Sequence, residues 1–180
     1  SQKKQNVSPY WDWKPRINPS VFYHRFFGTA PTHHIFGQRE ALNMILEEGR
    51  ENLFRRHEIL ARSIWAAVEH WAREGPLKLN VETEKDRSHS VTTFRADGYD
   101  LVVLRTWLKK NTGLELGPPL GFTEQKFLNG KSVCRIAHMG HLNPFMIHGI
   151  ISTIELGLLA CGIPHKAGGA EIASKTIISN

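Results

Sequence analysis

An arginine inside a short apolar run is the residue of this sequence whose type and position most clearly suggest chemistry. Arg135 lies in the stretch SVCRIAHMG, residues 132–140. In a strand, Val133, Arg135, Ala137 and Met139 would share one face, so the guanidinium would rise from an apolar surface. An unpaired buried charge is costly, and arginine is rarely buried without a partner. We therefore expect an anionic group to meet Arg135.

Three arrangements could satisfy this arginine. It could pair with an internal carboxylate, or it could lie on an edge strand from which its side chain reaches solvent. It could also hold the carboxylate of a ligand, because the planar guanidinium donates two parallel hydrogen bonds and suits this task better than lysine. Chemistry alone favours the first two arrangements, since structural ion pairs outnumber binding sites.

Ten histidines and two cysteines raise the alternative of a metal site. His138, His141 and His148 are close in sequence, but we expect them on a strand, in a turn and on a helix. No spacing such as HExxH accompanies them, so we interpret them as structural or surface residues and expect no bound metal. Cys134 and Cys161 form no CxxC motif and lie in apolar stretches, which indicates free thiols in a reducing compartment.

The composition bounds the class of protein. The chain has 180 residues, of which 41% are hydrophobic and 22% charged, as in an ordinary globular protein. Its 23 basic and 17 acidic residues give a net charge of +6, but they form no long basic run, so we expect no nucleic-acid binding. We find no stretch of eighteen apolar residues and no signal-peptide core, which predicts no membrane span and a cytoplasmic or organelle-matrix location.

The elements that must position these residues differ between the two ends of the chain. Residues 1–34 mix prolines with aromatic residues and fit no regular period. We expect another subunit or domain to cover Trp11, Trp13, Tyr23, Phe26 and Phe27.

A helix is predicted from Phe36 to Glu48, ending at Gly49. A long amphipathic helix follows and ends at Gly75-Pro76. Its apolar stripe comprises Leu53, Leu60, Ile64, Val68 and Trp71.

Short strands and further helices follow the long helix. Strands are predicted at residues 77–81, 90–96, 114–116 and 132–139. One helix is predicted over Asp100 to Asn111. Another begins at Asn143-Pro144, a favourable cap and first position, and ends before Gly162. This succession predicts an α/β or α+β fold, with helices packed on a small, mostly antiparallel sheet.

Three stretches in order along the chain resemble the C-terminal part of the class V aminotransferases, fold-type-I enzymes that use pyridoxal 5'-phosphate. They are FFGTAPTHHIFGQREAL at 26–42, EEGRENLFRRHEILARSIWAAVEHW at 47–71, and residues 132–169. The likeness is to serine-glyoxylate, alanine-glyoxylate and serine-pyruvate transaminases. It implies three parts: residues 1–48 as the tail and dimer-interface loop of a large cofactor-binding domain, 49–75 as a linking helix, and 76–180 as a small α/β domain.

The resemblance also implies two site residues. Arg135 matches the arginine that clamps the α-carboxylate of the amino acid or keto acid. Thr29 of FFGTAP matches the threonine that reaches across the dimer interface to the cofactor phosphate of the other subunit. Phe26 stands where some members have a tyrosine, so the phosphate contact of this loop rests on Thr29 and backbone amides. The alternative for Thr29 is a turn threonine that bonds its own backbone.

The implied activity moves an amino group from serine or alanine to glyoxylate or pyruvate in a homodimer. This chemistry needs a lysine that forms a Schiff base, which the resemblance places upstream of this sequence. The opening SQK imitates the Ser-Gln before that lysine, but Lys3 and Lys4 precede polar residues and stand too near Tyr10, so we interpret the match as coincidence. We therefore expect no catalytic residue here and no transamination by this chain alone. The alternative is a non-catalytic α/β module that binds an acidic metabolite or a partner chain.

Overall fold

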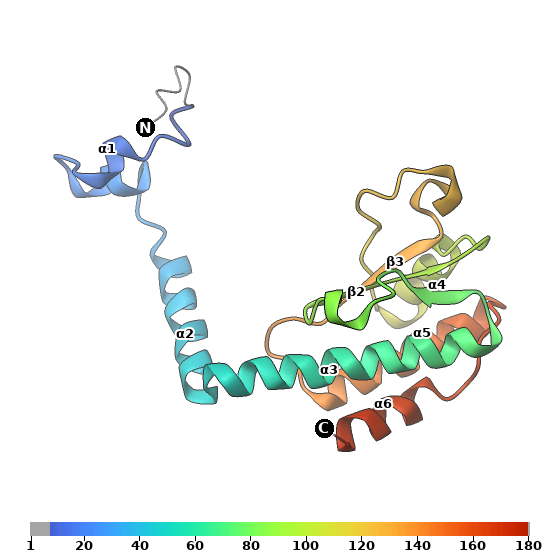
Figure 1. Cartoon of the computed structure of the whole chain (residues 1–180). Helices are drawn as coiled ribbons and strands as arrows, with labels where there is room; N and C mark the ends of the chain where they lie inside the picture. Colours follow the sequence, from blue (N-terminus) through green and yellow to red (C-terminus); the bar gives the residue numbers. More distant parts are fainter. Residues whose placement is uncertain (1–7, 180) are drawn as a thin grey trace. The chain divides into compact units, whose positions relative to one another are not determined.

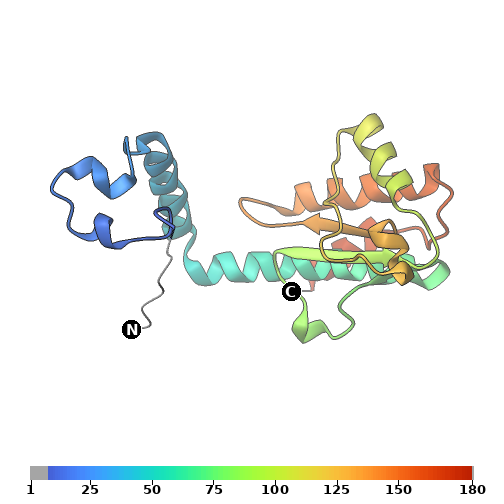
Figure 2. The same ribbon diagram turned by 90° about the horizontal axis from the view of Figure 1, so that it is seen from above.

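The computed structural model describes residues 8–179, and two views of the chain are given in Figures 1 and 2. The chain divides into two compact units, Ser1–Arg50 and Glu51–Asn180. Lys3 and Lys4 of the opening SQK lie outside the described residues. Among the helices of residues 8–179, none combines the length and the apolar character needed to span a membrane.

The first unit is built from short helical pieces and one longer helix. It contains α1 (Lys14–Ile17), the 3₁₀ turn η1 (Phe22–Phe26) and α2 (Thr32–Glu48) (Figure 1). Helix α2 begins at Thr32, directly after Pro31, and not at the predicted Phe36. The prediction missed the first turn because Thr32, His33 and His34 are polar and show no apolar period. It ends as predicted at Gly49, whose φ is 83° and whose N–H donates to the Ile45 carbonyl.

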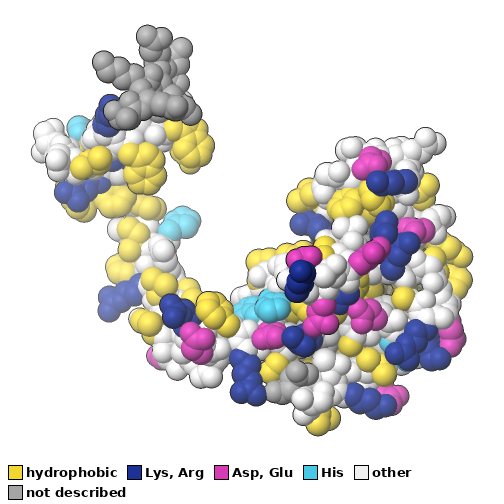
Figure 3. Space-filling view, in the orientation of Figure 1, with side chains coloured by type: hydrophobic (Ala, Val, Ile, Leu, Met, Phe, Trp, Pro, Cys, Tyr) yellow, Lys and Arg dark blue, Asp and Glu magenta, His cyan; other side chains and the backbone are white. Residues whose placement is uncertain are grey.

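Aromatic side chains of the first unit are exposed. No residue from 8 to 50 is buried, and hydrophobic side chains are visible on the surface of this segment in Figure 3. Trp11 and Trp13 are 68% and 66% exposed, and Phe27 is 56% exposed. The Arg16 guanidinium lies 4.2 Å from the centre of the Phe27 ring, so these residues contact one another without forming a core. Residues 8–50 therefore do not bury these rings among themselves.

A three-stranded antiparallel sheet organises the second unit. Its strands are β1 (Leu77–Leu79), β2 (Val91–Ala96) and β3 (Val133–Ala137), in the order β1-β2-β3. This confirms the predicted small sheet. The strand predicted at 114–116 is wrong, because these residues pair with no strand and only the next residue, Gly117, forms an isolated bridge with Arg135. Pro118 and Pro119 follow immediately, and proline has no N–H with which to extend a ladder.

Four helices accompany the sheet. They are α3 (Arg50–Trp71), followed by the 3₁₀ turn η2 (Ala72–Glu74), then α4 (Val102–Thr112), α5 (Pro144–Ala160) and α6 (Gly169–Ile178). Two further 3₁₀ segments, η3 (Glu84–Asp86) and η4 (Gln125–Gly130), lie in the connections. The predicted cap of α5 is confirmed, since the Asn143 side chain accepts a hydrogen bond from the Met146 N–H.

Helix α6 was not predicted, because its cap comes from another helix. Glu155 of α5 accepts hydrogen bonds from the N–H groups of Gly168 and Gly169, at 2.8 and 2.7 Å, and from Trp71 Nε1 at 2.7 Å. Burial alone would raise the pKa of Glu155, but these hydrogen bonds outweigh it and lower the pKa. The sequence around Gly168 carries no local capping side chain, so the start of this helix depends on tertiary structure.

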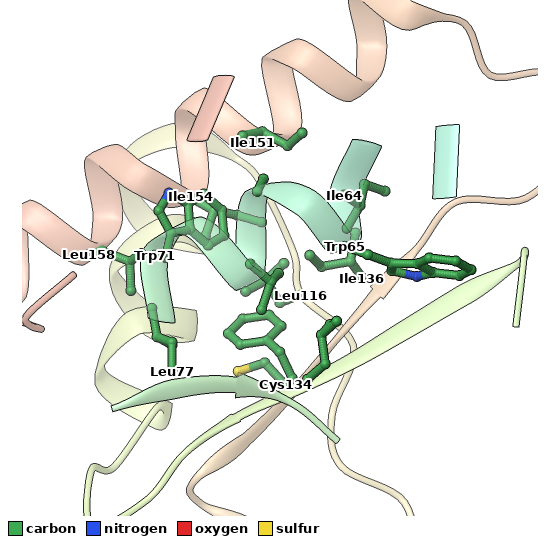
Figure 4. Packing of buried hydrophobic residues seen from close by; sticks show 14 of the residues in the cluster. Ile64, Trp65, Trp71, Leu77, Leu116, Cys134, Ile136, Ile151, Ile154 and Leu158 are labelled. Carbon is green, nitrogen blue, oxygen red and sulfur yellow. The ribbon is translucent and has the colours of Figure 1, made fainter. Parts of the chain in front are cut away.

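One hydrophobic core lies between the sheet and the helices (Figure 4). Figure 4 shows Ile64 and Trp71 of α3, Ile154 and Leu158 of α5, and Cys134 of β3 within it. The apolar stripe predicted for α3 is confirmed at Leu60, Ile64, Val68 and Trp71, which are buried, whereas Leu53 is only half-buried. Gly157 lets α4 approach α5 closely, since a Cβ at this position would lie 2.7 Å from a Leu108 side-chain atom.

Candidate functional site

The alternation of β3 separates a core face from a face that carries Arg135. Cys134 and Ile136 are 0% and 2% exposed and pack into the core. Arg135 is half-buried on the opposite face and pairs in register with Thr93 of β2. The expectation of an arginine buried among apolar residues is therefore corrected: β3 buries its neighbours and holds the guanidinium on the other side of the sheet.

The two cysteines are free thiols, as predicted. Cys134 is buried beneath the sheet and Cys161 is half-buried at the end of α5. Burial raises the pKa of the Cys134 thiol to about 12 and also raises the pKa of Cys161. Because the thiolate is the reactive form, neither residue has the environment of a nucleophile.

The Arg135 guanidinium binds a backbone carbonyl and not a carboxylate. Its Nε–H donates to the Pro118 carbonyl oxygen at 2.7 Å. Among residues 8–179, no Asp or Glu forms an ion pair with Arg135. The internal ion pair that the sequence left open is therefore not formed within the described part of the chain. Contact with solvent and contact with a ligand carboxylate are the two remaining arrangements, and both are compatible with a half-buried Arg135.

A pocket of about 290 Å³ lies beside Arg135. Its polar lining comprises Arg135, Asp86, Arg87, Ser88, Thr92 and Thr93, and its apolar lining comprises Trp65, Leu79, Val81 and Val91. Arg87 is already engaged, because it pairs with Glu69 at 2.8 Å and donates to the carbonyls of Val81 and Glu82. Arg135 is thus the cation of this lining whose charge has no carboxylate partner within residues 8–179.

A buried polar chain runs behind the pocket from α3 to the end of β3. Trp65 Nε1–H donates to Thr92 Oγ1 at 2.9 Å, and Thr92 Oγ1 lies 2.8 Å from His138 Nε2. His138 Nδ1 lies 3.1 Å from the His89 carbonyl, which can only accept, so Nδ1 carries the proton and Nε2 accepts from Thr92. Burial lowers the pKa of His138 to about 4. The interpretation of His138 as a structural histidine is confirmed.

The other histidines do not join His138 in a metal site. Within residues 8–179, no group of three or more His, Cys, Asp or Glu side chains is placed to hold a metal ion. His141 is exposed in the turn after β3, and His148 is half-buried on α5.

Thr29 belongs to the first unit, in the turn between η1 and α2. Phe27 and Gly28 before it have positive φ angles of 63° and 148°, which reverse the chain and leave Thr29 exposed. The turn-threonine alternative requires a hydrogen bond from its hydroxyl to nearby backbone, and none is present among the described residues. The hydroxyl is therefore available to a group outside the described chain.

Sequence reasoning missed several groups around Arg135. The Pro118 carbonyl is a backbone group, which no residue pattern singles out. Thr92 lies 46 residues from His138, and their pairing follows only from strand register. Arg87 could have been noticed as an arginine shortly before a strand rich in β-branched residues. Its ion pair with Glu69 could not be predicted, because Glu69 lies on α3.

The chain is similar in sequence to known aminotransferases. No protein-family profile matches it. The chain is 32% identical over 182 residues to serine-glyoxylate aminotransferase of Arabidopsis thaliana, covering 99% of this chain and 38% of the relative. It is 30% identical to serine-glyoxylate aminotransferase of Methylorubrum extorquens, covering 94% of this chain and 40% of the relative.

A solved structure is also similar. It is pyridoxamine-pyruvate aminotransferase of Mesorhizobium loti, with a TM-score of 0.72 and 26% sequence identity over 84% of this chain and 37% of that chain. The chain thus spans about two fifths of the length of these relatives.

The low pKa of His138 predicts a pH dependence of stability. In the unfolded chain the imidazole binds a proton near pH 6.5, whereas in the folded chain it does so only near pH 4. Between these values the unfolded state binds more protons, so the free energy of unfolding should fall as pH decreases, by up to about 3 kcal/mol from this residue. Urea unfolding at intervals from pH 7 to pH 4 measures it.

Two variants isolate this contribution from that of the carboxylates. His138→Gln should lose this share of the pH dependence, because glutamine does not titrate. His141→Gln, which changes an exposed histidine, should retain it. Equal slopes for the wild type and His138→Gln would show that the buried imidazole is not the titrating group.

Proposed function

The chain is homologous to the C-terminal part of the class V aminotransferases, and on this premise we propose that it supplies the substrate-carboxylate site of an enzyme that transfers an amino group between a small amino acid and a 2-oxo acid. The observation that carries the proposal is Arg135, a cation in a pocket lining with no carboxylate partner among residues 8–179, at the position where the resemblance expects the carboxylate clamp. Serine as donor and glyoxylate or pyruvate as acceptor fit the names of the relatives described above, and alanine fits a further relative, alanine-glyoxylate aminotransferase of Mus musculus, at 29% identity.

In the proposed reaction Arg135 binds and orients the substrate. Donor and acceptor both carry a carboxylate next to the reacting carbon, so one guanidinium serves both halves of the reaction. Two parallel hydrogen bonds fix the carboxylate plane and thereby the direction of the bond to be broken. Arg87 of the pocket lining pairs with Glu69, so Arg135 is the cation there that has no ion-pair partner among residues 8–179, and Asp86 is the acidic residue of the same lining.

Pyridoxal 5'-phosphate is the cofactor that this reaction implies. When bound, it accepts the amino group and withdraws electrons from the substrate carbon. Thr29 fits a phosphate contact, since its hydroxyl is exposed and has no partner among residues 8–179. No described lysine is buried, which supports a Schiff-base lysine elsewhere in the enzyme. We propose that a part of the enzyme outside these residues supplies it, whether on the same polypeptide or on another.

A homodimer accounts for the exposed aromatic residues of the first unit. Trp11, Trp13, Phe22, Tyr23 and Phe27 are each more than half exposed. Aromatic residues are enriched in protein interfaces, where their area contributes most of the binding energy. We propose that a second subunit covers these rings and that the turn carrying Thr29 reaches its cofactor.

Replacing Arg135 by lysine tests the carboxylate site. Lysine keeps the charge but cannot make two parallel hydrogen bonds, so in the complete enzyme the KM for glyoxylate should rise about ten- to hundredfold. The near-visible absorbance of the bound cofactor should be unchanged. Arg73→Lys, at an exposed position on η2, is the matched control. A wild-type KM in Arg135→Lys would remove Arg135 from the site.

The role of Thr29 is tested by cofactor retention. Thr29→Ala removes one hydroxyl donor to a dianionic phosphate, so the free energy of cofactor binding should weaken by about 1–3 kcal/mol. Thr29→Ser keeps the hydroxyl and should bind almost as the wild type. Equilibrium dialysis of the complete enzyme gives the dissociation constants. Equal values for the alanine and serine variants would leave Thr29 as a turn residue only.

The aromatic surface predicts a dimer in solution. Light scattering of the complete enzyme should give twice the mass of one subunit. Replacing Trp11 and Trp13 together by serine should shift the protein towards monomer, because the dimer interface would lose the apolar area that these two rings bury in it. Ile178→Ser removes an apolar residue of α6 that is more exposed still, at 85%, and should leave the dimer intact. A wild-type enzyme that is monomeric would contradict this assignment.

A further inference from the structure

The segment beside β3 binds Arg135 through its backbone. Gly117 N–H donates to the Arg135 carbonyl at 2.8 Å, and Arg135 N–H donates to the Gly117 carbonyl at 3.1 Å. Both backbone groups of Arg135 are thus used on this side, which makes the pairing with Thr93 on the other side a non-hydrogen-bonded one. The position of the Arg135 backbone is therefore fixed jointly by β2 and by this segment.

The same segment determines where the Arg135 side chain can lie. A Cβ at Gly117 would stand 3.2 Å from Arg135 Cβ and 3.5 Å from Arg135 Nε, so the arginine passes across the glycine. An added Cβ would be tight against Arg135 Cβ, so Gly117 leaves room for this side chain; a left-handed backbone is not involved, since its φ is not positive. One residue further, the Pro118 carbonyl accepts the Nε–H at 2.7 Å. Glycine makes room for the side chain and the proline carbonyl orients it.

This segment is itself held by its neighbours. Leu116 is 6% exposed and anchors one end in the core. Pro118 and Pro119 restrict the backbone, because each fixes its own φ and the second keeps the first extended. The Pro119 ring lies against Gly130, where an added Cβ would be 3.0 Å from Pro119 Cγ. The carbonyl that orients Arg135 is therefore part of a constrained turn.

We propose that residues 116–119 form a positioning device for Arg135, which makes the guanidinium bind the substrate carboxylate end-on through Nη1 and Nη2. The inference rests on the proposed function. A carboxylate can approach a guanidinium along its Nε side or at its end. The Pro118 carbonyl occupies Nε–H, so the two terminal nitrogens provide the pair of parallel donors. The arginine is held in place before substrate arrives, which reduces the ordering that binding requires.

The first measurement uses the wild-type 180-residue chain. Hydrogen exchange of arginine Nε–H groups, followed by ¹⁵N NMR, should be at least about tenfold slower for Arg135 than for Arg73, which is exposed on η2. Addition of sodium glyoxylate should leave this Nε–H bond in place. An Arg135 Nε–H that exchanges as fast as that of Arg73 would overturn the positioning role without any variant.

The second measurement uses Gly117→Ala in the complete, cofactor-loaded enzyme. The new methyl group displaces the side chain, so the KM for glyoxylate should rise about tenfold while cofactor binding is unchanged. Gly149→Ala, at an open position of α5 with no atom within 4 Å of the added Cβ, is the matched control. If Arg135→Lys raises KM and Gly117→Ala does not, the positioning role is wrong and the proposed function stands. If neither variant raises KM, Arg135 is not the carboxylate site and both proposals fall.

Discussion

The alternation of side chains along β3 is the constraint on which the site depends. Cys134 and Ile136 must enter the core, and this requirement fixes the register of β3 against β2. A shift by one residue would bury the guanidinium and expose two core residues, so the free energy of the core also holds Arg135 on the opposite face. The segment 116–119 then determines the direction of the side chain within that face.

Two polar side chains, Arg135 within β3 and His138 directly after it, have different surroundings. His138 is fully buried, so its imidazole stays neutral and bridges Thr92 to the His89 carbonyl. Arg135 lies on a half-buried face, and the Pro118 carbonyl accepts from one of the five N–H groups of its guanidinium. The hydrogen-bonded network around His138 is thus closed to solvent, whereas the Arg135 guanidinium lies on a face that is partly open.

Sequence patterns predicted the elements whose signals are local. The stripe of α3 follows from helical period, and Asn143-Pro144 marks the start of α5. The start of α6 was missed because its cap, Glu155, comes from α5. A strand at 114–116 was predicted from its residues, yet the only pairing here is one bridge at Gly117, immediately before two prolines. Arg135 was identified from the sequence, whereas the Pro118 carbonyl was not, because backbone partners depend on tertiary structure.

The most direct test of the account is a crystal structure of the complete, cofactor-loaded enzyme with a non-reactive monocarboxylate such as glycolate. We predict that the carboxylate oxygens lie within hydrogen-bond distance of Arg135 Nη1 and Nη2, and that Nε remains on the Pro118 carbonyl. A carboxylate bound by another arginine, with Arg135 paired to a carboxylate of the protein, would contradict the account.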